Sequence, residues 1–322
     1  MRILLIVNAS ASSVTARTRV KIQTVLTERH EVEVASTSRR GHAARLARGA
    51  ANTGTDAVIV LGGDGTLNEA ANGLAGTDCA LAALPGGSTN VFARTIGTPD
   101  DPLAAARLVV LALEQGAVRR VGLGSVDGRH FLFHCGMGFD AAVVEQVERR
   151  SALKRYAGHP LFVFAGFDTW IRHYDRKHPP MKVRYPDGTS VDDSFLTIVL
   201  NTDPYTYLGS RPLSIAPDAT LDRGLCVVAV RTMSFGPLLG LIGSMFRGKD
   251  LRDDPRIDYR TDLSQVEVSL AGPTTKAFPY QVDGDHLGNA ETLKFAWSPE
   301  AIRLVIPAEA VDSTRDQEPE VG

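Results

Sequence analysis

The sequence has few cysteines, no excess of basic residues and no long hydrophobic run. Its three cysteines, Cys79, Cys135 and Cys226, are far apart in apolar surroundings, so they predict neither a disulfide framework nor a metal cluster. A reducing compartment is therefore expected. The 35 Lys and Arg residues are balanced by 37 Asp and Glu residues, which argues against nucleic acid as a partner.

Long apolar segments are also missing. No run reaches the ~18 uninterrupted apolar residues of a membrane-spanning helix. The strand-like start of the chain, residues 2–7, is too short for the apolar region and cleavage site of a signal peptide. We therefore expect any membrane contact to be peripheral.

The most informative stretch is GGDGTLNE at residues 62–69, which follows an apolar, β-branched run at residues 57–61. Such a run predicts a buried strand, and the glycines allow a sharp turn whose backbone N–H groups can bind an anion. Thr66 or Asn68 is expected to cap the helix that follows. Asp64 would repel phosphate, so it is expected to hold a magnesium ion, its waters or a ribose hydroxyl. An ordinary strand–turn–helix loop is the alternative.

A second glycine turn, PGGSTN at residues 85–90, follows another apolar run at residues 80–84. Two such turns at the ends of adjacent parallel strands can face each other across one cleft, which favours a nucleotide site. Further along, residues 281–285 read QVDGD. Asp-Gly in this setting is also typical of a hairpin turn.

In combination, GGDGTLNE, PGGSTN and QVDGD resemble the motifs of the diacylglycerol kinase catalytic family. That family includes bacterial diacylglycerol kinases and the eukaryotic sphingosine and ceramide kinases. The resemblance extends from Met1 to about Pro307. GGDG alone is also found in NAD kinases, which share the wider superfamily.

The resemblance implies ATP and magnesium as cofactors and a lipid alcohol as the substrate. It also implies that Asp283 or Asp285 accepts the hydroxyl proton and that Asp64 binds magnesium for catalysis. The residues that it implies in nucleotide binding are Asn8, Thr37, Gly62, Gly63, Asp64, Gly65, Thr66, Asn68, Glu69, Gly87, Ser88 and Asn90. For Asn8 and Thr37, capping of a helix is an almost equally good explanation.

Three positions, Val91, Gly122 and Arg223, lack an acid that many relatives carry. In relatives the last of these belongs to a structural magnesium site, and an arginine there would repel a cation. We expect that site to be absent or replaced by a salt bridge. The losses predict either low activity or substitution by nearby acids.

The order of apolar runs and helical stretches predicts two domains. Residues 1–124 are expected to form an α/β nucleotide-binding domain with a parallel sheet. Short alternating runs separated by Asp-Gly turns predict an antiparallel β-sandwich with flanking helices at residues 125–294, which would bind the lipid acceptor. The resemblance implies that residues 295–308 return to the first domain. The polar residues 309–322 predict a disordered tail.

Two stretches suit contact with anionic lipid headgroups: the aromatic and basic Lys154–Tyr174 and the apolar Ser234–Phe246. Packing of these helices on the sandwich is the alternative. A cytoplasmic protein that associates peripherally with the inner face of the membrane is expected, and a homodimer is left open.

The favoured hypothesis is an ATP- and magnesium-dependent kinase that converts diacylglycerol to phosphatidic acid. An NAD kinase-like phosphotransferase is the second hypothesis. Against it, Asn68 and Glu69 directly follow GGDGTL, whereas NAD kinases carry their Asn-Glu pair well downstream. The third hypothesis is a catalytically weak lipid- or nucleotide-binding member of the family, suggested by the three missing acids.

Overall fold

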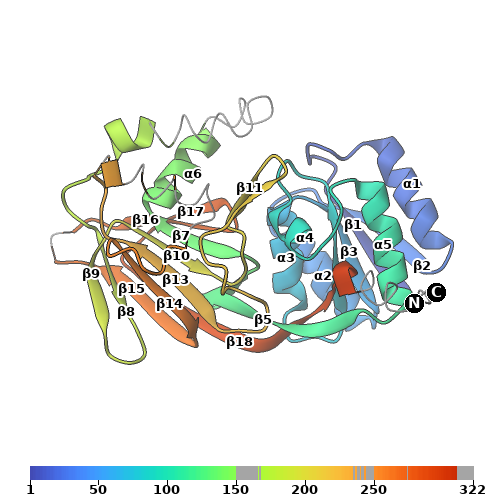
Figure 1. Ribbon diagram of the computed structural model, residues 1–322. Helices are drawn as coiled ribbons and strands as arrows, with labels where there is room; N and C mark the ends of the chain where they lie inside the picture. Colours follow the sequence, from blue (N-terminus) through green and yellow to red (C-terminus); the bar gives the residue numbers. More distant parts are fainter. Residues whose placement is uncertain are drawn as a thin grey trace, which may run out of the picture. The chain divides into compact units, whose positions relative to one another are not determined.

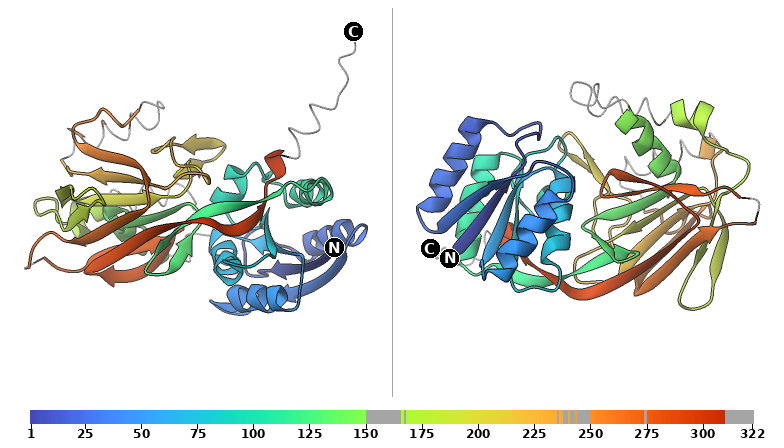
Figure 2. Two further views of the ribbon diagram at one scale, coloured as in Figure 1. Left: turned by 90° about the horizontal axis from the view of Figure 1, so that it is seen from below. Right: turned by 180° about the vertical axis from the view of Figure 1, so that it is seen from behind.

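The computed structural model describes residues 1–149, 166, 168–234, 236, 237, 240, 243, 250–273 and 275–309. The chain divides into two compact units (Figure 1). The first comprises Met1–Val121 together with the chain from Pro299 onward, and the second comprises Gly122–Ser298. Two strands, β5 (Val118–Val126) and β18 (Thr292–Val305), belong to both units, and Figure 2 shows β18 as one continuous strand.

The first unit is built on a parallel sheet. Its strands run in the order β2-β1-β3-β4, and the end of β18 pairs in parallel with β4. These strands are β1 (Arg2–Val7), β2 (Glu31–Ser36), β3 (Ala57–Gly62) and β4 (Ala80–Pro85). Every residue of β3 and β4 is buried, as expected for central strands made of continuous apolar runs.

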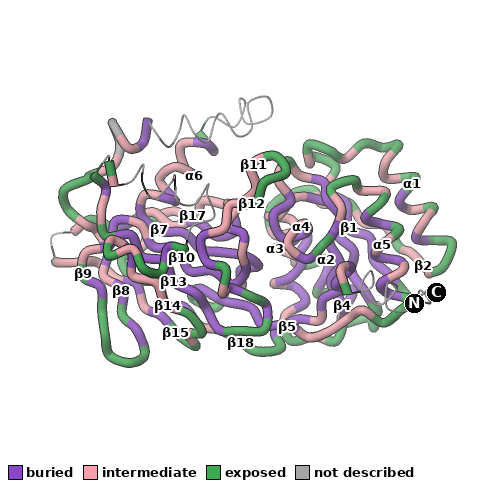
Figure 3. The backbone as a smooth tube through the Cα atoms, viewed as in Figure 1, coloured by how far each residue is buried: buried purple, intermediate pink, exposed green. Residues whose placement is uncertain are grey.

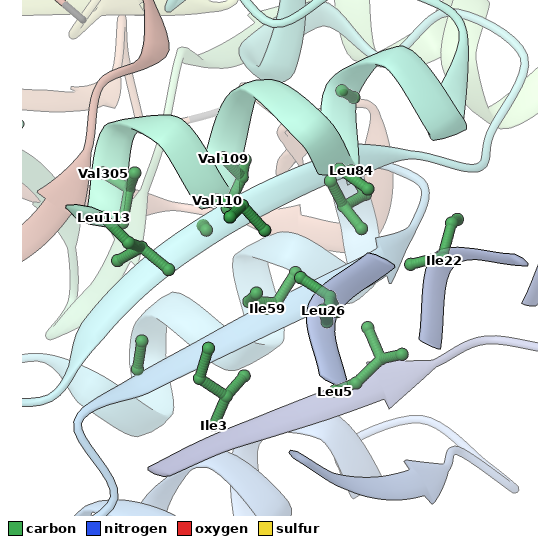
Figure 4. Close-up of a cluster of buried hydrophobic side chains, with 14 of the residues drawn as sticks. Ile3, Leu5, Ile22, Leu26, Ile59, Leu84, Val109, Val110, Leu113 and Val305 are labelled. Atoms are coloured by element: carbon green, nitrogen blue, oxygen red, sulfur yellow. The ribbon is translucent and has the colours of Figure 1, made fainter. Parts of the chain in front are cut away.

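Side chains alternate between the two faces of this sheet, and helices cover both faces. On one face, Ile3, Leu5 and Ile59 pack against α1 (Ala16–Thr27) and α5 (Pro102–Glu114), as Figure 4 shows. The helices α2 (His42–Asn52) and α3 (Asp64–Leu74) pack together on the other face. A short helix, α4 (Val91–Thr95), follows the second glycine turn.

The helices α2 and α3 approach each other closely at Gly73. A Cβ atom there would lie 2.4 Å from the carbonyl oxygen of Ala44. We expect Gly73→Ala to lower the free energy of unfolding by about 1–3 kcal/mol in urea denaturation, the usual effect of overpacking. Gly49→Ala is the matched control in α2, because a Cβ atom at Gly49 meets no atom within 4 Å. The free energy of unfolding of that variant is expected to rise by about 0.5–1 kcal/mol. Equal stability of the two variants would contradict the close packing.

The second unit is a sandwich of two antiparallel sheets. One sheet has the strand order β14-β13-β10-β7-β16-β17, and the other joins β18 to β15, β8 and β9, with β5 and β6 alongside. The first sheet consists of β7 (His134–Gly138), β10 (Leu196–Leu200), β13 (Leu225–Val230), β14 (Ile257–Leu263), β16 (Phe278–Val282) and β17 (Asp285–Ala290). The second sheet adds β6 (Arg129–Phe131), β8 (Met181–Arg184), β9 (Ser190–Ser194) and β15 (Gln265–Leu270).

The core of this unit lies between the two sheets. Buried side chains such as Met137 and Val227 from one sheet meet Val183 and Phe295 from the other, and Figure 3 shows β13 as buried. Outside the sandwich lie α6 (Phe139–Arg149), the π-helical turn η1 (Thr169–His173) and the hairpin of β11 (Thr206–Leu208) and β12 (Arg211–Leu213). A parallel α/β part followed by an antiparallel sandwich confirms the predicted fold class.

Some predicted segments lie outside the described residues. These are residues 154–165 and 167, most of residues 235–246, and the predicted tail from residue 310. Within the described ranges, no helix is both long enough and apolar enough to cross a membrane.

Candidate active site

Three of the predicted nucleotide-binding residues lie at one edge of the parallel sheet. Asn8 follows β1, Thr37 follows β2, and Gly62 is the last residue of β3. The strands pair in register, so their carboxyl ends bring these residues and the second glycine turn after β4 to the same edge. Ligand sites of open α/β sheets lie at this edge.

The two glycine turns touch each other directly. The N–H group of Gly86 donates to the carbonyl oxygen of Gly62 at 2.9 Å. A Cβ atom on Gly86 would lie 2.9 Å from the Cα atom of Gly62, and one on Gly87 would lie 2.8 Å from that of Gly63. The predicted cleft between the turns is therefore wrong, because the glycines let one turn pack on the other. The cavity lined by residues of both turns has a volume of about 10 Å³, far below the ~300 Å³ of small ligand sites.

Asn90 and Ser13 hold the second glycine turn in place. Asn90 has a left-handed backbone with φ of 51°, and its Oδ1 atom accepts the N–H group of Gly87 at 2.8 Å. Its Nδ2 atom donates to Asp100 at 3.0 Å. The hydroxyl of Ser13 donates to the carbonyl oxygen of Gly87 at 3.2 Å, a role that no motif around Ser13 signals. Ser88 is exposed at the tip of the turn and is accessible to a ligand.

Asp64 links the first glycine turn to α4. Its carboxylate accepts the N–H groups of Val91 at 3.0 Å and Phe92 at 3.1 Å, which caps α4. The helix α3 itself begins at Asp64, with Gly63 as its N-cap residue in an extended conformation. The expectation that Thr66 or Asn68 caps α3 is therefore wrong.

A magnesium ion fits the Asp64 carboxylate when other ligands come from ATP and water. In the part of the chain that the structure describes, no group of three or more His, Cys, Asp or Glu side chains gathers to form a metal cage. Magnesium is commonly bound by one or two carboxylates together with waters and substrate phosphates.

Other polar residues of GGDGTLNE contact neighbouring parts of the chain. The Thr66 hydroxyl accepts the Nδ2 group of Asn8 at 2.9 Å, so these two predicted residues are brought together. Asn68 is only 1% exposed within α3. The Glu69 carboxylate accepts the N–H groups of Gly41 at 2.7 Å and Ala43 at 3.1 Å, which caps α2. Glu69 thereby fixes the start of a neighbouring helix, a role that the motif alone did not predict.

The N–H groups of Gly63 and Gly65 are available for an anion. Among the described residues, none accepts a hydrogen bond from either group. Both groups lie at the start of α3, where the helix dipole adds partial positive charge. They can bind a phosphate beside the Asp64 carboxylate.

In the second unit, Asp283 and Gly284 form the two-residue turn between β16 and β17. Both residues have positive φ angles, 48° and 81°, as a type I′ hairpin requires. Asp283 is 4% exposed, and its carboxylate accepts the N–H groups of Leu132 at 2.8 Å, Phe133 at 3.0 Å and His134 at 3.2 Å. These bonds hold the turn between β6 and β7.

Asp285 begins β17 and is partly exposed, in contrast to Asp283. The preceding Gln281 is fully buried, and its Oε1 atom accepts the N–H group of Gly284 at 2.8 Å. Its Nε2 atom donates to the carboxylate of Asp140 at 2.7 Å. Gln281 and Asp283 thus hold the turn from inside, and Asp285 is the more accessible acid of the motif.

The structure explains two of the three positions without an acid. Val91 is buried and donates its N–H group to Asp64. A Cβ atom on Gly122 would lie 2.4 Å from the indole ring of Trp297, so no acidic side chain fits there. Arg223 is exposed in the turn before β13.

The fold is that of diacylglycerol kinase-like proteins. A crystal structure of a diacylglycerol kinase from Bacillus anthracis str. Sterne superposes with a TM-score of 0.69 at 23% identity, covering 95% of this chain and 96% of that chain. Another structure from the same organism superposes with a TM-score of 0.73 at 24% identity, covering 95% and 97%.

Sequence relatives agree with this fold. A Pseudomonas aeruginosa protein named "Probable lipid kinase YegS-like" is 27% identical over 280 residues, covering 86% of this chain and 85% of the relative. The diacylglycerol kinase of Bacillus subtilis is 26% identical over 291 residues, covering 89% of each chain. Residues 2–126 match the family model of the diacylglycerol kinase catalytic domain. These matches confirm the resemblance of the motifs to the diacylglycerol kinase catalytic family.

Proposed function

We propose that this protein is an ATP- and magnesium-dependent kinase that phosphorylates a lipid alcohol, with diacylglycerol as the acceptor and phosphatidic acid as the product. The observation that carries the proposal is the pair of contacting glycine turns, where the N–H groups of Gly63 and Gly65 lie beside the Asp64 carboxylate. The match to the family model supports phosphoryl transfer, and the names of the relatives support a lipid acceptor.

Phosphoryl transfer needs a bound ATP, charge stabilisation and an acceptor for the hydroxyl proton. In this proposal Gly63, Gly65 and the Ser88 hydroxyl bind phosphate oxygens, and Asp64 holds magnesium. When bound, magnesium supplies positive charge against the charge on the phosphoryl oxygens. We assign proton acceptance to Asp285, because it is partly exposed. Asp283, whose carboxylate is directed at three backbone N–H groups, is assigned to hold the turn.

The test is transfer of labelled phosphate from ATP, with magnesium present, to diacylglycerol in mixed micelles. Labelled phosphatidic acid is the expected product. Label on NAD and not on lipid would favour the NAD kinase-like hypothesis. Saturable ATP binding with no transfer to diacylglycerol, sphingoid bases or other lipid alcohols would favour a binding protein, and either result would overturn the proposal.

We also propose that the second unit contacts anionic lipid headgroups near Trp170. The indole N–H group of Trp170 donates to the carbonyl oxygen of Met233 at 3.1 Å, directly before the predicted apolar stretch. Trp170, in one predicted headgroup-binding stretch, therefore contacts the residue directly before the other. The Arg176 guanidinium lies 4.2 Å from the centre of the Trp170 ring, the Arg172 side chain is 73% exposed, and Lys177 is exposed. Tryptophan with exposed cations is typical of membrane interfaces.

The double variant Arg176→Glu/Lys177→Glu is expected to bind phosphatidylglycerol vesicles at least ~30-fold more weakly in co-sedimentation, because each basic residue lost contributed about 1 kcal/mol and each glutamate is repelled by the anionic surface. Phosphorylation of diacylglycerol dispersed in detergent is expected to persist. The control Arg184→Glu/Arg211→Glu changes the charge equally at exposed positions elsewhere in the second unit. Equal loss of binding in both double variants would show an effect of net charge alone and would contradict this surface.

A further inference from the structure

A buried polar network lies behind the turn that carries Asp285. Its centre is Asp140, at the start of α6, which is 7% exposed. One oxygen of its carboxylate accepts the Tyr205 hydroxyl, and the other accepts the Nε2 group of Gln281 at 2.7 Å. A Cβ atom at Gly136 would lie 1.7 Å from the Asp140 carboxylate, so glycine in β7 leaves the space that the carboxylate fills.

The donors around this buried carboxylate are neutral. The His134 ring stacks on the Tyr205 ring with their centres 4.5 Å apart. Burial lowers the pKa of His134 to about 4, although Asp140 acts in the opposite direction, so the imidazole is uncharged at neutral pH. Within the described ranges, no Lys or Arg forms an ion pair with Asp140. A buried carboxylate without a cation depends on each of its hydrogen bonds, which makes the positions of both donors rigid.

The network continues from Asp140 to the backbone on both sides of Asp285. The Oε1 atom of Gln281 accepts the N–H group of Gly284 at 2.8 Å, directly before Asp285. The Glu148 carboxylate, two turns further along α6, accepts the N–H group of His286 at 3.2 Å, directly after it. Two acids of one helix therefore fix the two neighbours of the proposed proton acceptor.

We infer that Asp140 is a positioning residue: through Gln281 it fixes the Asp283-Gly284 turn and so places the Asp285 carboxylate for the reaction. Glu148 secures the following residue from the same helix. This inference rests on the proposed function, because the position of Asp285 affects kcat only if Asp285 accepts the hydroxyl proton. The contacts themselves do not depend on that function.

The test compares Asp140→Asn with Asp140→Ala in the full chain. Asparagine keeps the shape, and the Tyr205 hydroxyl can accept as readily as donate, so both hydrogen bonds are retained. We expect kcat close to that of the wild type. Alanine removes both bonds, and kcat is expected to fall about 10²-fold, the effect of a displacement of about 1 Å at a catalytic group. The KM for ATP should not change, because the glycine turns belong to the first unit.

Hydrogen–deuterium exchange provides a readout that is independent of activity. The backbone N–H groups of Gly284 and His286 are expected to exchange faster in Asp140→Ala and as slowly as in the wild type in Asp140→Asn. Tyr205→Phe is the control, because it removes one bond of Asp140 and leaves its bond to Gln281. If Asp140→Ala does not fold, Gln281→Met cuts the same connection to Gly284.

Two results would overturn the inference. One is an alanine variant with wild-type exchange at Gly284 and wild-type kcat. The other is an asparagine variant that loses as much kcat as alanine does, which would mean that Asp140 acts through its charge. Failure of the proposed function has a different signature: the wild type would transfer no phosphate to lipid, while exchange at Gly284 would still respond to Asp140→Ala.

Discussion

Replacement of Asp64 by asparagine is expected to lower phosphoryl transfer about 10²–10³-fold, the size of effect seen when one group that stabilises transition-state charge is removed. The variant keeps one oxygen for the N–H groups of α4 but loses the negative charge that would hold magnesium. The magnesium concentration for half-maximal activity is therefore expected to rise. The loss of a helix cap lowers the free energy of unfolding by only about 1 kcal/mol.

The matched control for this prediction is Asp101→Asn. Asp101 caps α5 in the same unit, where its carboxylate accepts the N–H group of Ala104 at 2.7 Å. Both variants replace an aspartate with asparagine and weaken the cap of a helix, but Asp101 has no assigned role in binding or catalysis. Labelled-phosphate assays at saturating diacylglycerol should show normal turnover for this control. Normal turnover in Asp64→Asn, or an equal loss in both variants, would refute the role of Asp64.

The central part of the fold could be predicted from local sequence. The runs at residues 3–7, 57–61 and 80–84 are continuous and apolar, which is what strands buried on both faces require, and they form β1, β3 and β4. Glycine and polar residues after these runs correctly locate the carboxyl edge of the sheet. These signals lie within a few residues of one another, so one sequence suffices to read them.

Contacts between distant segments could not be predicted in this way. Glu69 reads as part of a nucleotide motif, but its carboxylate caps a helix that begins 27 residues earlier at His42. Asp283 reads as a turn residue or a catalytic acid, but its carboxylate bonds to a turn about 150 residues away in the chain. A local sequence pattern shows the type of each residue but not the distant residue that it contacts. The network of Asp140, Tyr205 and Gln281 was missed for the same reason.

Half-exposed strands gave the weakest signal. β14 contains Asp258, Arg260 and Asp262 within seven residues, and most of it is only partly buried. Charged residues occupy its partly exposed positions, so it lacks the continuous apolar run that marks a fully buried strand. Its place is set by pairing with β13, which is apolar and entirely buried. Long-range pairing of this kind outweighs local propensity.

The two acids of QVDGD are expected to differ in what their loss does. Asp285→Asn should lower turnover about 10²–10⁴-fold, the usual range for a general base, without changing the free energy of unfolding. Asp283→Asn should instead destabilise the protein. In the wild type both carboxylate oxygens accept backbone N–H groups, whereas asparagine replaces one of these oxygens with an NH₂ donor. Each buried N–H group that is left without an acceptor lowers the free energy of unfolding by about 1–3 kcal/mol.

Urea denaturation and labelled-phosphate assays on both variants separate these effects, provided that turnover is measured where each protein is folded. The structure predicts a stable, inactive Asp285→Asn and a less stable Asp283→Asn that keeps more of its turnover. The opposite pattern, with Asp285→Asn active and Asp283→Asn stable but inactive, would move proton acceptance to Asp283. The carboxylate of Asp283 would then have to release at least one of the N–H groups of residues 132–134 during the reaction, because those bonds occupy it in this structure.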